Sequence, residues 1–144
     1  METTYRIVML LCALLLSTAA AWAGDTTRVS VGSAGVEGDD ESFCPSISAN
    51  GRFIAFGSYA GNLVPDDTNA REDAFLHDRK RATTRRVSVD STGGEADGGV
   101  LFSFFLPSVS ANGRSVAFSS ESTNLVAQDS NRVADIFVRE ARHR

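Results

Sequence analysis

Residues 45–78 read PSISANGRFIAFGSYAGNLVPDDTNAREDAFLHD, and residues 107–140 repeat this stretch without a gap as PSVSANGRSVAFSSESTNLVAQDSNRVADIFVRE. Seventeen of the 34 positions are identical. A shorter piece is also shared, TTRVSV at residues 26–31 and TRRVSV at residues 84–89. Self-similarity at a spacing of 58 to 62 residues indicates one supersecondary unit copied in series, and such units bury their apolar faces by stacking on one another.

Each copy reads as short strands separated by turns. The sequence Ala49-Asn50-Gly51 predicts a tight turn, because Asn and Gly tolerate positive φ. The run FIAF at residues 53–56, which ends at Gly57-Ser58, is apolar on both faces and predicts a fully covered inner strand. Strands are expected at residues 45–48, 53–58, 73–78 and 85–89 and, in the second copy, at 107–110, 115–119 and 135–139.

Four short antiparallel strands per repeat are typical of a β-propeller blade. The run P-S-[IV]-S-A-N-G-R-x-[IV]-A-F, followed by D-x-F, resembles the WD-like propeller repeats of the TolB type, which read P-x-[FW]-S-P-D-G-x-x-[IL]-A-[FY]. The chain departs from that pattern at the turn, where Ala-Asn replaces Pro-Asp, and Asn serves the turn as Asp does. The matching positions are Pro45, Ser48, Gly51, Ala55 and Phe56, and Pro107, Ser110, Gly113, Ala117 and Phe118.

The resemblance covers nearly all of residues 24–140 and implies an all-β fold, a partial β-propeller built from two four-stranded antiparallel blades. We assign two repeats to this range, with cores at residues 45–89 and 107–140, and an unpatterned tail to residues 141–144. Two blades do not close a ring, because known propellers use about four to eight. We therefore expect a piece of a longer propeller, with assembly of several chains as the alternative.

Residues 1–23 are expected to be a secretory signal peptide. Arg6 gives a positive start, residues 7–16 are an uninterrupted apolar run, and Ala21-Trp22-Ala23 offers a cleavage site before Gly24. The apolar run is shorter than the roughly 20 residues that span a bilayer, which disfavours a membrane anchor. We expect a periplasmic or secreted protein with no membrane span after cleavage. Its net charge of −4 gives no reason to expect nucleic acid as a partner.

The loop before the third strand of each copy is the best candidate for a metal site. Both copies share the pattern D-x-N-x-x-x-D after Asn-Leu-Val. Alternating oxygen side chains followed by a carboxylate suit calcium, which takes six to eight oxygen ligands. The alternative is that Asp and Asn form Asx-turns that order a long loop. The candidate ligands are Asp67, Asn69 and Asp73 in the first copy and Asp129, Asn131 and Asp135 in the second.

Three other features have plainer interpretations. The run VLFSFFL at residues 100–106 is either an exposed contact patch or packing between blades, and we favour packing. The acidic run at residues 37–41 is expected to be a solvated loop. Cys44 is the one cysteine left after signal cleavage, so no internal disulfide forms, and we expect it to serve as a small apolar filler.

The sequence carries no signature of an enzyme. It has two histidines, His77 and His143, and lacks G-x-S-x-G, H-E-x-x-H and P-loop motifs. The resemblance to TolB-type propellers implies an interaction platform. We expect a non-enzymatic module that binds a protein or a surface glycan, or associates with itself through exposed blade faces. The alternatives are an accessory propeller of a prolyl oligopeptidase-like hydrolase and a calcium-stabilised structural module.

Export provides the test of the signal-peptide prediction. Cells that carry the gene are expected to export a product that begins at Gly24, as read by N-terminal sequencing. Ala23→Leu should block this cleavage, because signal peptidase requires a small residue there. An exported product that retains Met1 would contradict the prediction.

Overall fold

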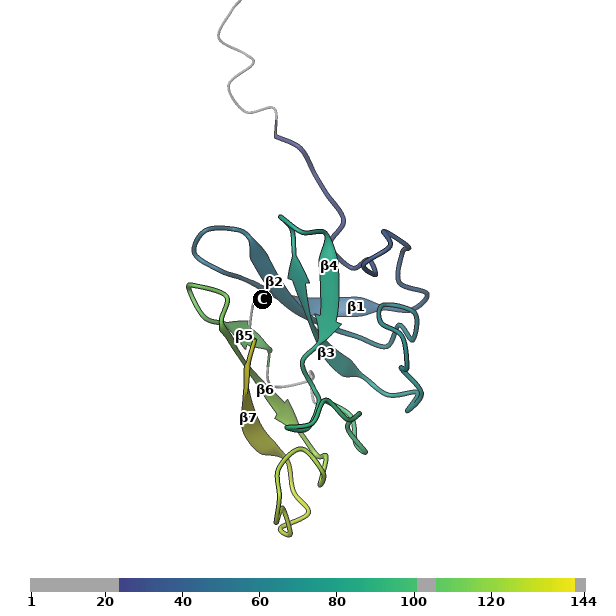
Figure 1. Ribbon diagram of the computed structural model, residues 1–144, viewed down its shortest axis with the longest axis vertical. Helices are drawn as coiled ribbons and strands as arrows, with labels where there is room; N and C mark the ends of the chain where they lie inside the picture. The colour runs from purple at the N-terminus through teal and green to yellow at the C-terminus, as the bar shows by residue number, and fades with distance from the viewer. Residues whose placement is uncertain (1–23, 101–105, 142–144) are drawn as a thin grey trace, which may run out of the picture.

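The computed structural model describes residues 24–100 and 106–141, which form two antiparallel β-sheets (Figure 1). The predicted signal peptide, most of the run at residues 100–106 and the last three residues lie outside the described range. Within that range no helix is long and apolar enough to cross a bilayer. The first sheet has the order β1-β2-β3-β4, with strands Ser42–Ile47, Phe53–Ser58, Asp73–Asp78 and Thr83–Arg86. The second has the order β5-β6-β7, with strands Ser108–Val109, Ser115–Ser120 and Asp135–Glu140.

The all-β prediction is confirmed, but the prediction of four strands in both sheets is wrong for the second sheet. That sheet has three strands, and no described strand pairs with the outer edge of β7. In the first sheet the fourth strand comes from the TRRVSV piece at residues 84–89. The other copy of this piece, residues 26–31, precedes both repeats and lies against the first sheet, where Val29 packs.

The bounds of β2 and β3 are as predicted, the other strands differ by one or more residues, and two of these differences have an identifiable cause. β1 begins at Ser42, before the expected Pro45, and a register shift between Phe43 and Ser46 accommodates Cys44, whose φ is 55°. β4 ends at Arg86, before the expected Val89. There the Ser88 hydroxyl accepts the hydrogen bond of the Ala74 amide at 3.0 Å, so a side chain replaces the backbone ladder.

The same side-chain hydrogen bonds build the predicted turn in each copy. In the first copy the Asn50 side-chain oxygen accepts from the Arg52 amide at 3.0 Å, and the Ser48 hydroxyl accepts from the Phe53 amide at 3.0 Å. Asn112 and Ser110 repeat both contacts in the second copy. Gly51 and Gly113 complete the turns with φ angles of 68° and 73°, which favour glycine.

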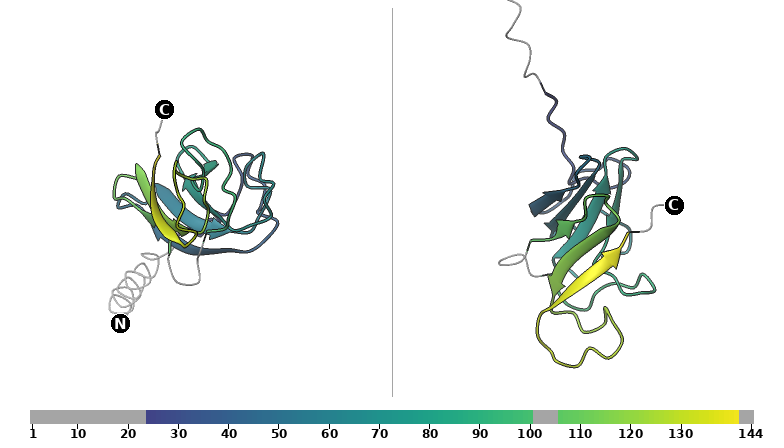
Figure 2. Two further views of the ribbon diagram at one scale, coloured as in Figure 1. Left: turned by 90° about the horizontal axis from the view of Figure 1, so that it is seen from below. Right: turned by 90° about the vertical axis from the view of Figure 1, so that its left-hand side faces the viewer.

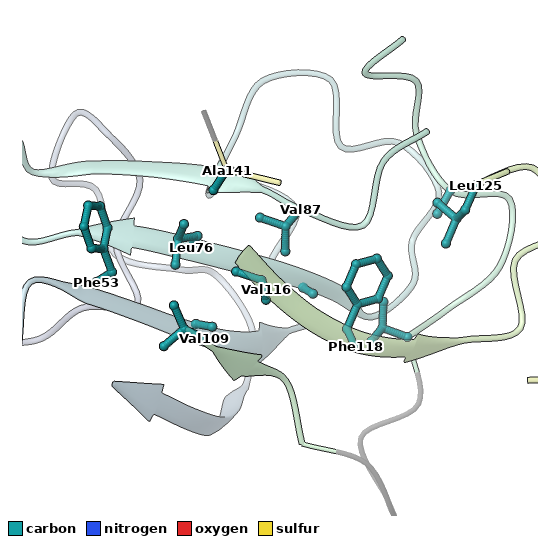
Figure 3. Packing of buried hydrophobic residues seen from close by; sticks show 12 residues of the cluster. Phe53, Leu76, Val87, Val109, Val116, Phe118, Leu125 and Ala141 are labelled. Carbon is teal, nitrogen blue, oxygen red and sulfur yellow. The ribbon is translucent and has the colours of Figure 1, made fainter. Parts of the chain in front are cut away.

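The two sheets stack face to face around one apolar cluster (Figures 2 and 3). Phe53, Leu76 and Val87 of the first repeat meet Val116 and Phe118 of the second in this cluster. Such burial is the main favourable term in folding. Half-buried Cys44 packs against the same cluster, in keeping with the predicted filler role.

Each sheet has two apolar faces, which we call leading and trailing according to their order along the stack. The leading face carries Ile54, Phe56 and Phe75 in the first sheet and the equivalent Val116, Phe118 and Phe137 in the second. The trailing face carries Ala55, Ala74 and Leu76 in the first sheet and the equivalent Ala117, Ile136 and Val138 in the second. The trailing face of the first sheet packs on the leading face of the second. Both faces of β2 are therefore buried, as predicted.

Gly113 of the second sheet lies directly against the Phe53 ring of the first sheet. A Cβ atom placed there would lie 2.0 Å from Cδ2 of Phe53, whereas a Cβ atom at Gly51 would meet nothing closer than 3.9 Å. Gly113→Ala should therefore lower the free energy of unfolding by about 2 to 4 kcal/mol, since it combines backbone strain with overpacking. Gly51→Ala has the same backbone strain alone and should cost about 1 kcal/mol.

Urea denaturation of both variants measures this difference. Equal losses at the two positions would contradict the stacking of Phe53 on Gly113.

Candidate functional site

The most concentrated polar site surrounds Arg86, the last residue of β4. Its Nη1 atom lies 2.6 Å from Oε1 of Glu95 and 3.3 Å from carboxylate oxygens of both Asp67 and Asp73. Nη2 donates to the Asp66 carbonyl at 3.0 Å. The Arg86 side chain is almost completely buried. We call Asp67, Asp73, Arg86 and Glu95 the ionic cluster.

The loop that supplies Asp67 is held in shape by Asn69. The Asn69 side-chain oxygen accepts from the Arg71 amide at 2.9 Å, and its nitrogen donates to Asp73 and to the Ala96 carbonyl at 3.2 Å each. Asp66 and Ala70, which precede and follow Asn69 in this loop, have left-handed backbone conformations. This is the Asx-turn arrangement that the sequence offered as the alternative to a metal ligand.

Glu95 joins the loop to the segment that leads into the second repeat. Its carboxylate accepts from the Thr68 amide at 2.8 Å, from the Thr68 hydroxyl at 2.7 Å and from the Asn69 amide at 3.3 Å. Asp73 is anchored from the other side, because its Oδ1 atom accepts from the Ser88 hydroxyl. The ionic cluster thus ties one repeat to the connection that follows it.

Burial and the local charges push the carboxyl groups of the cluster in opposite directions. Burial, reinforced by the charge of Asp73, raises the pKa of Asp67 to about 6, and burial also raises the pKa of Asp73. Burial acts to raise the pKa of Glu95 as well, but hydrogen bonds from Thr68 and Arg86 outweigh it and lower that pKa to about 2. Glu95 is therefore the firmly ionised partner of Arg86.

The second copy has the same loop without the arginine. The Asn131 side chain donates to Asp135 at 2.7 Å and accepts from the Val133 amide at 3.1 Å, and Gln128 and Arg132 take the left-handed conformations. In the described part of the chain, no basic side chain forms an ion pair with Asp129 or Asp135.

The N-terminal segment contains an arginine and a glutamate that are equivalent to Arg86 and Glu95. Arg28 and Glu37 form an ion pair, and they stand 58 residues before Arg86 and Glu95. The Arg28 and Glu37 side chains are 55% and 72% exposed, against 8% and 21% for Arg86 and Glu95. The described residues therefore contain one complete ionic cluster and two complementary halves.

The metal prediction places its ligands in these loops, and it stays a prediction. Carboxylate oxygens of Asp67, Asp73 and Glu95 lie within 4.8 Å of one another, close enough to surround a cation. The Arg86 guanidinium already lies among them, so calcium would have to displace it. Asp129, Asn131 and Asp135 have no such described competitor.

Arg86 and Glu95 were missed by the sequence reasoning, although the sequence contains a signal for them. The pattern R-V-S-V-x-S-x-x-x-E occurs at residues 28–37 and again at residues 86–95. An arginine and a glutamate held nine residues apart in both copies would have predicted a recurrent ion pair.

The other residues that the sequence analysis singled out make contacts within the fold. Glu37, at the start of the acidic run, pairs with Arg28, and Val100 is buried in the core between the sheets. Residues 101–105 of the aromatic run lie outside the described residues. His77 is buried, which lowers its pKa, and its Nδ1 atom hydrogen-bonds the Thr84 hydroxyl at 2.9 Å.

Comparison with known proteins leaves the function to be argued from the structure. No protein-family model matches the chain, and no curated protein matches its sequence.

The ionic cluster predicts opposite pH effects for two conservative substitutions. Because the folded pKa of Glu95 lies below its ordinary 4.5, Glu95 stabilises the fold above pH 4.5, and this contribution is lost as the pH falls towards 2. Because the pKa of Asp67 is raised from 3.8 to about 6, the stability linked to Asp67 is present below pH 4 and is lost as the pH rises through 6.

Glu95→Gln should therefore lower the free energy of unfolding by about 2 kcal/mol at pH 7 and by much less near pH 2. Asp67→Asn should abolish the decrease in stability that the wild-type protein shows between pH 4 and 6 because of Asp67. Urea denaturation from pH 2 to 8 measures both effects. Parallel pH profiles for the two variants would contradict this assignment of charges.

Thermal melting tests the metal prediction. If Asp129, Asn131 and Asp135 bind calcium, millimolar calcium should raise Tm by mass action and a chelator should reverse the rise. Asp135→Asn should abolish the response, and Asp73→Asn serves as the matched control in the first copy. A Tm indifferent to calcium and chelator would overturn the metal prediction.

Proposed function

We propose that this protein is a secreted or periplasmic, TolB-like propeller-repeat protein that acts as a non-enzymatic protein-binding module. The observation that carries the proposal is the exposed trailing face of the second sheet. Ile136 and Val138 are each 64% exposed on β7, whereas the equivalent Ala74 and Leu76 of β3 are buried at 0% and 1%. An apolar face at a position that is buried in the other repeat is suited to binding a partner.

The way the repeats stack supports the propeller-repeat part of the proposal. Two small antiparallel sheets lie trailing face to leading face, with equivalent residues at equivalent places in the two repeats. A propeller is built by repeating this arrangement around an axis. The TolB-like sequence pattern supplies the residues at its turns and inner strands.

The outer edge of β7 adds a second way of binding. Its antiparallel pairing with β6 uses one edge of the strand, and no described strand covers the other. Free amide and carbonyl groups on such an edge accept an added strand, which is a common mode of recognition between proteins. The edge and the trailing face adjoin each other, so one partner can occupy both.

Several acidic groups with shifted pKa values form ion pairs that hold the fold together, which is the structural role expected of acidic groups in a binding module. The pKa of Asp78 is lowered to about 2 chiefly by its hydrogen bond with Arg52, whose Nε and Nη2 atoms donate at 2.8 and 2.6 Å. Asp73 and Glu95 are held in the ionic cluster by Arg86. These contacts join strands and loops within the fold.

Photo-crosslinking in the producing cells tests the proposed function. A photoreactive phenylalanine analogue at position 136 should yield a covalent adduct with a protein, because that position lies at the centre of the proposed surface. The same analogue at Lys80, an exposed position in the turn between β3 and β4, is the control. Absence of a protein adduct at position 136, or equal adducts at both positions, would contradict the proposal.

A further inference from the structure

We infer that the surface formed by the trailing face of the second sheet and the outer edge of β7 binds the N-terminal segment, residues 26–41, and the adjoining first sheet of a second copy of this chain. The inference rests on the proposed function, whose protein partner it identifies. It follows from the internal repeat, because each feature that is exposed at one end of the stack has a buried equivalent between the two sheets.

The N-terminal segment already lies on the first sheet as residues 84–99 lie on the second. The Asn62 side chain donates to the Glu37 carbonyl at 2.8 Å, and the equivalent Asn124 donates to the Glu95 carbonyl at 2.8 Å. Isolated bridges repeat in the same way, between residues 31 and 37 and between residues 89 and 95. The N-terminal segment is therefore held in the position of a connection that arrives from a preceding sheet.

The start of this segment repeats β4 but has no partner strand among the described residues. In the first sheet, Arg85 and Arg86 pair with Leu76 and Phe75 of β3. Shifted by the repeat, the same register places Thr27 of the second copy opposite Val138 and Arg28 opposite Phe137. The second copy would thus supply the fourth strand of the second sheet.

The apolar surfaces of the two ends are complementary. Val109 of β5, 9% exposed, packs in the cluster that covers Leu76. Its equivalent in the first repeat, Ile47 of β1, is 60% exposed. Docking in the repeated arrangement would place Ile47 of the second copy over Ile136 and Val138. It would cover exposed apolar side chains on both chains, and this burial favours association.

The charges at the two ends are also complementary. Asp129 and Asp135 form no described ion pair, and Arg28 with Glu37 is the exposed half of an ionic cluster. The repeated arrangement would bring Arg28 of the second copy between Asp129 and Asp135, as Arg86 lies between Asp67 and Asp73. A cluster that is incomplete in each chain would be completed across the interface.

Such a contact joins different surfaces of the two chains, so it is heterologous. A heterologous contact either closes into a ring or continues as an open polymer. With two sheets per chain, two to four chains would give the roughly four to eight sheets of a closed propeller.

Two substitutions at Thr27 test the strand contact. The Val87 amide donates to Ala74 of β3, so the amides of residues 85 and 87 face β3. By the repeat, the amide of Thr27 in the second copy faces β7 of the first copy. Thr27→Pro removes this amide and should weaken self-association of the full chain at least tenfold in light scattering. Thr27→Ala keeps the amide and should leave self-association nearly unchanged.

Mixing two blocked variants tests the direction of the contact. Thr27→Pro leaves the β7 surface intact, and Ile136→Asp leaves the N-terminal segment intact. Each variant alone should be monomeric, and the mixture should form a one-to-one heterodimer with one intact interface. Circular dichroism melts of both variants serve as the folding control, since both positions are exposed.

The outcomes separate this inference from the proposed function. Self-association that survives Thr27→Pro, or a mixture that stays monomeric, would overturn the head-to-tail contact. A wild-type chain that stays monomeric at all concentrations would overturn it as well. If the position-136 adduct then contains a different protein, the proposed function stands and the second copy is rejected as its partner. An adduct composed of two copies of this chain supports both.

Discussion

The strands β2, β3 and β7 carry apolar side chains on both faces, so a sheet built around such strands must be covered on both sides. Phe56 and Phe75 point to one side of the first sheet and Leu76 to the other, and all three are buried. The first sheet is covered on its leading face by Leu63 of the β2–β3 loop together with Val29 of the N-terminal segment, and on its trailing face by the second sheet (Figure 2). The second sheet is covered on its leading face, while Ile136 and Val138 of its trailing face remain exposed. The proposed binding surface is a direct consequence of this constraint.

The ionic cluster fixes the connection between the sheets, which apolar packing alone does not orient. Apolar burial is roughly proportional to area and has no preferred direction. Glu95 lies in the connection, Asp67 and Asp73 belong to the repeat before it, and Arg86 bridges them at the end of β4. The same residue types recur at the exposed ends of the stack, which is why the charges there can be matched by a second copy.

The inner strands were predictable because each contains a run of consecutive apolar residues, which indicates burial on both faces. β2 and β3 have the predicted bounds, and β7 begins at the predicted Asp135. The edges of the sheet depended on interactions between distant residues. Cys44 adopts a left-handed conformation in β1, and the Ser88 hydroxyl ends β4, so neither boundary follows from a local pattern. The carboxylates of the site were found from their spacing, but a loop read alone gave no indication that Arg86 would lie among them.

In the proposed assembly, the outer edge and trailing face of the second sheet are an unfinished interface. Hydrogen exchange of the Ile136 and Val138 amides at increasing protein concentration tests it most directly, with the amides of Ala74 and Leu76 as internal references. We expect fast exchange of these two β7 amides in dilute protein, and protection that approaches that of the β3 amides as the concentration rises. Protection of β7 that equals that of β3 at every dilution, or that never appears, would contradict it.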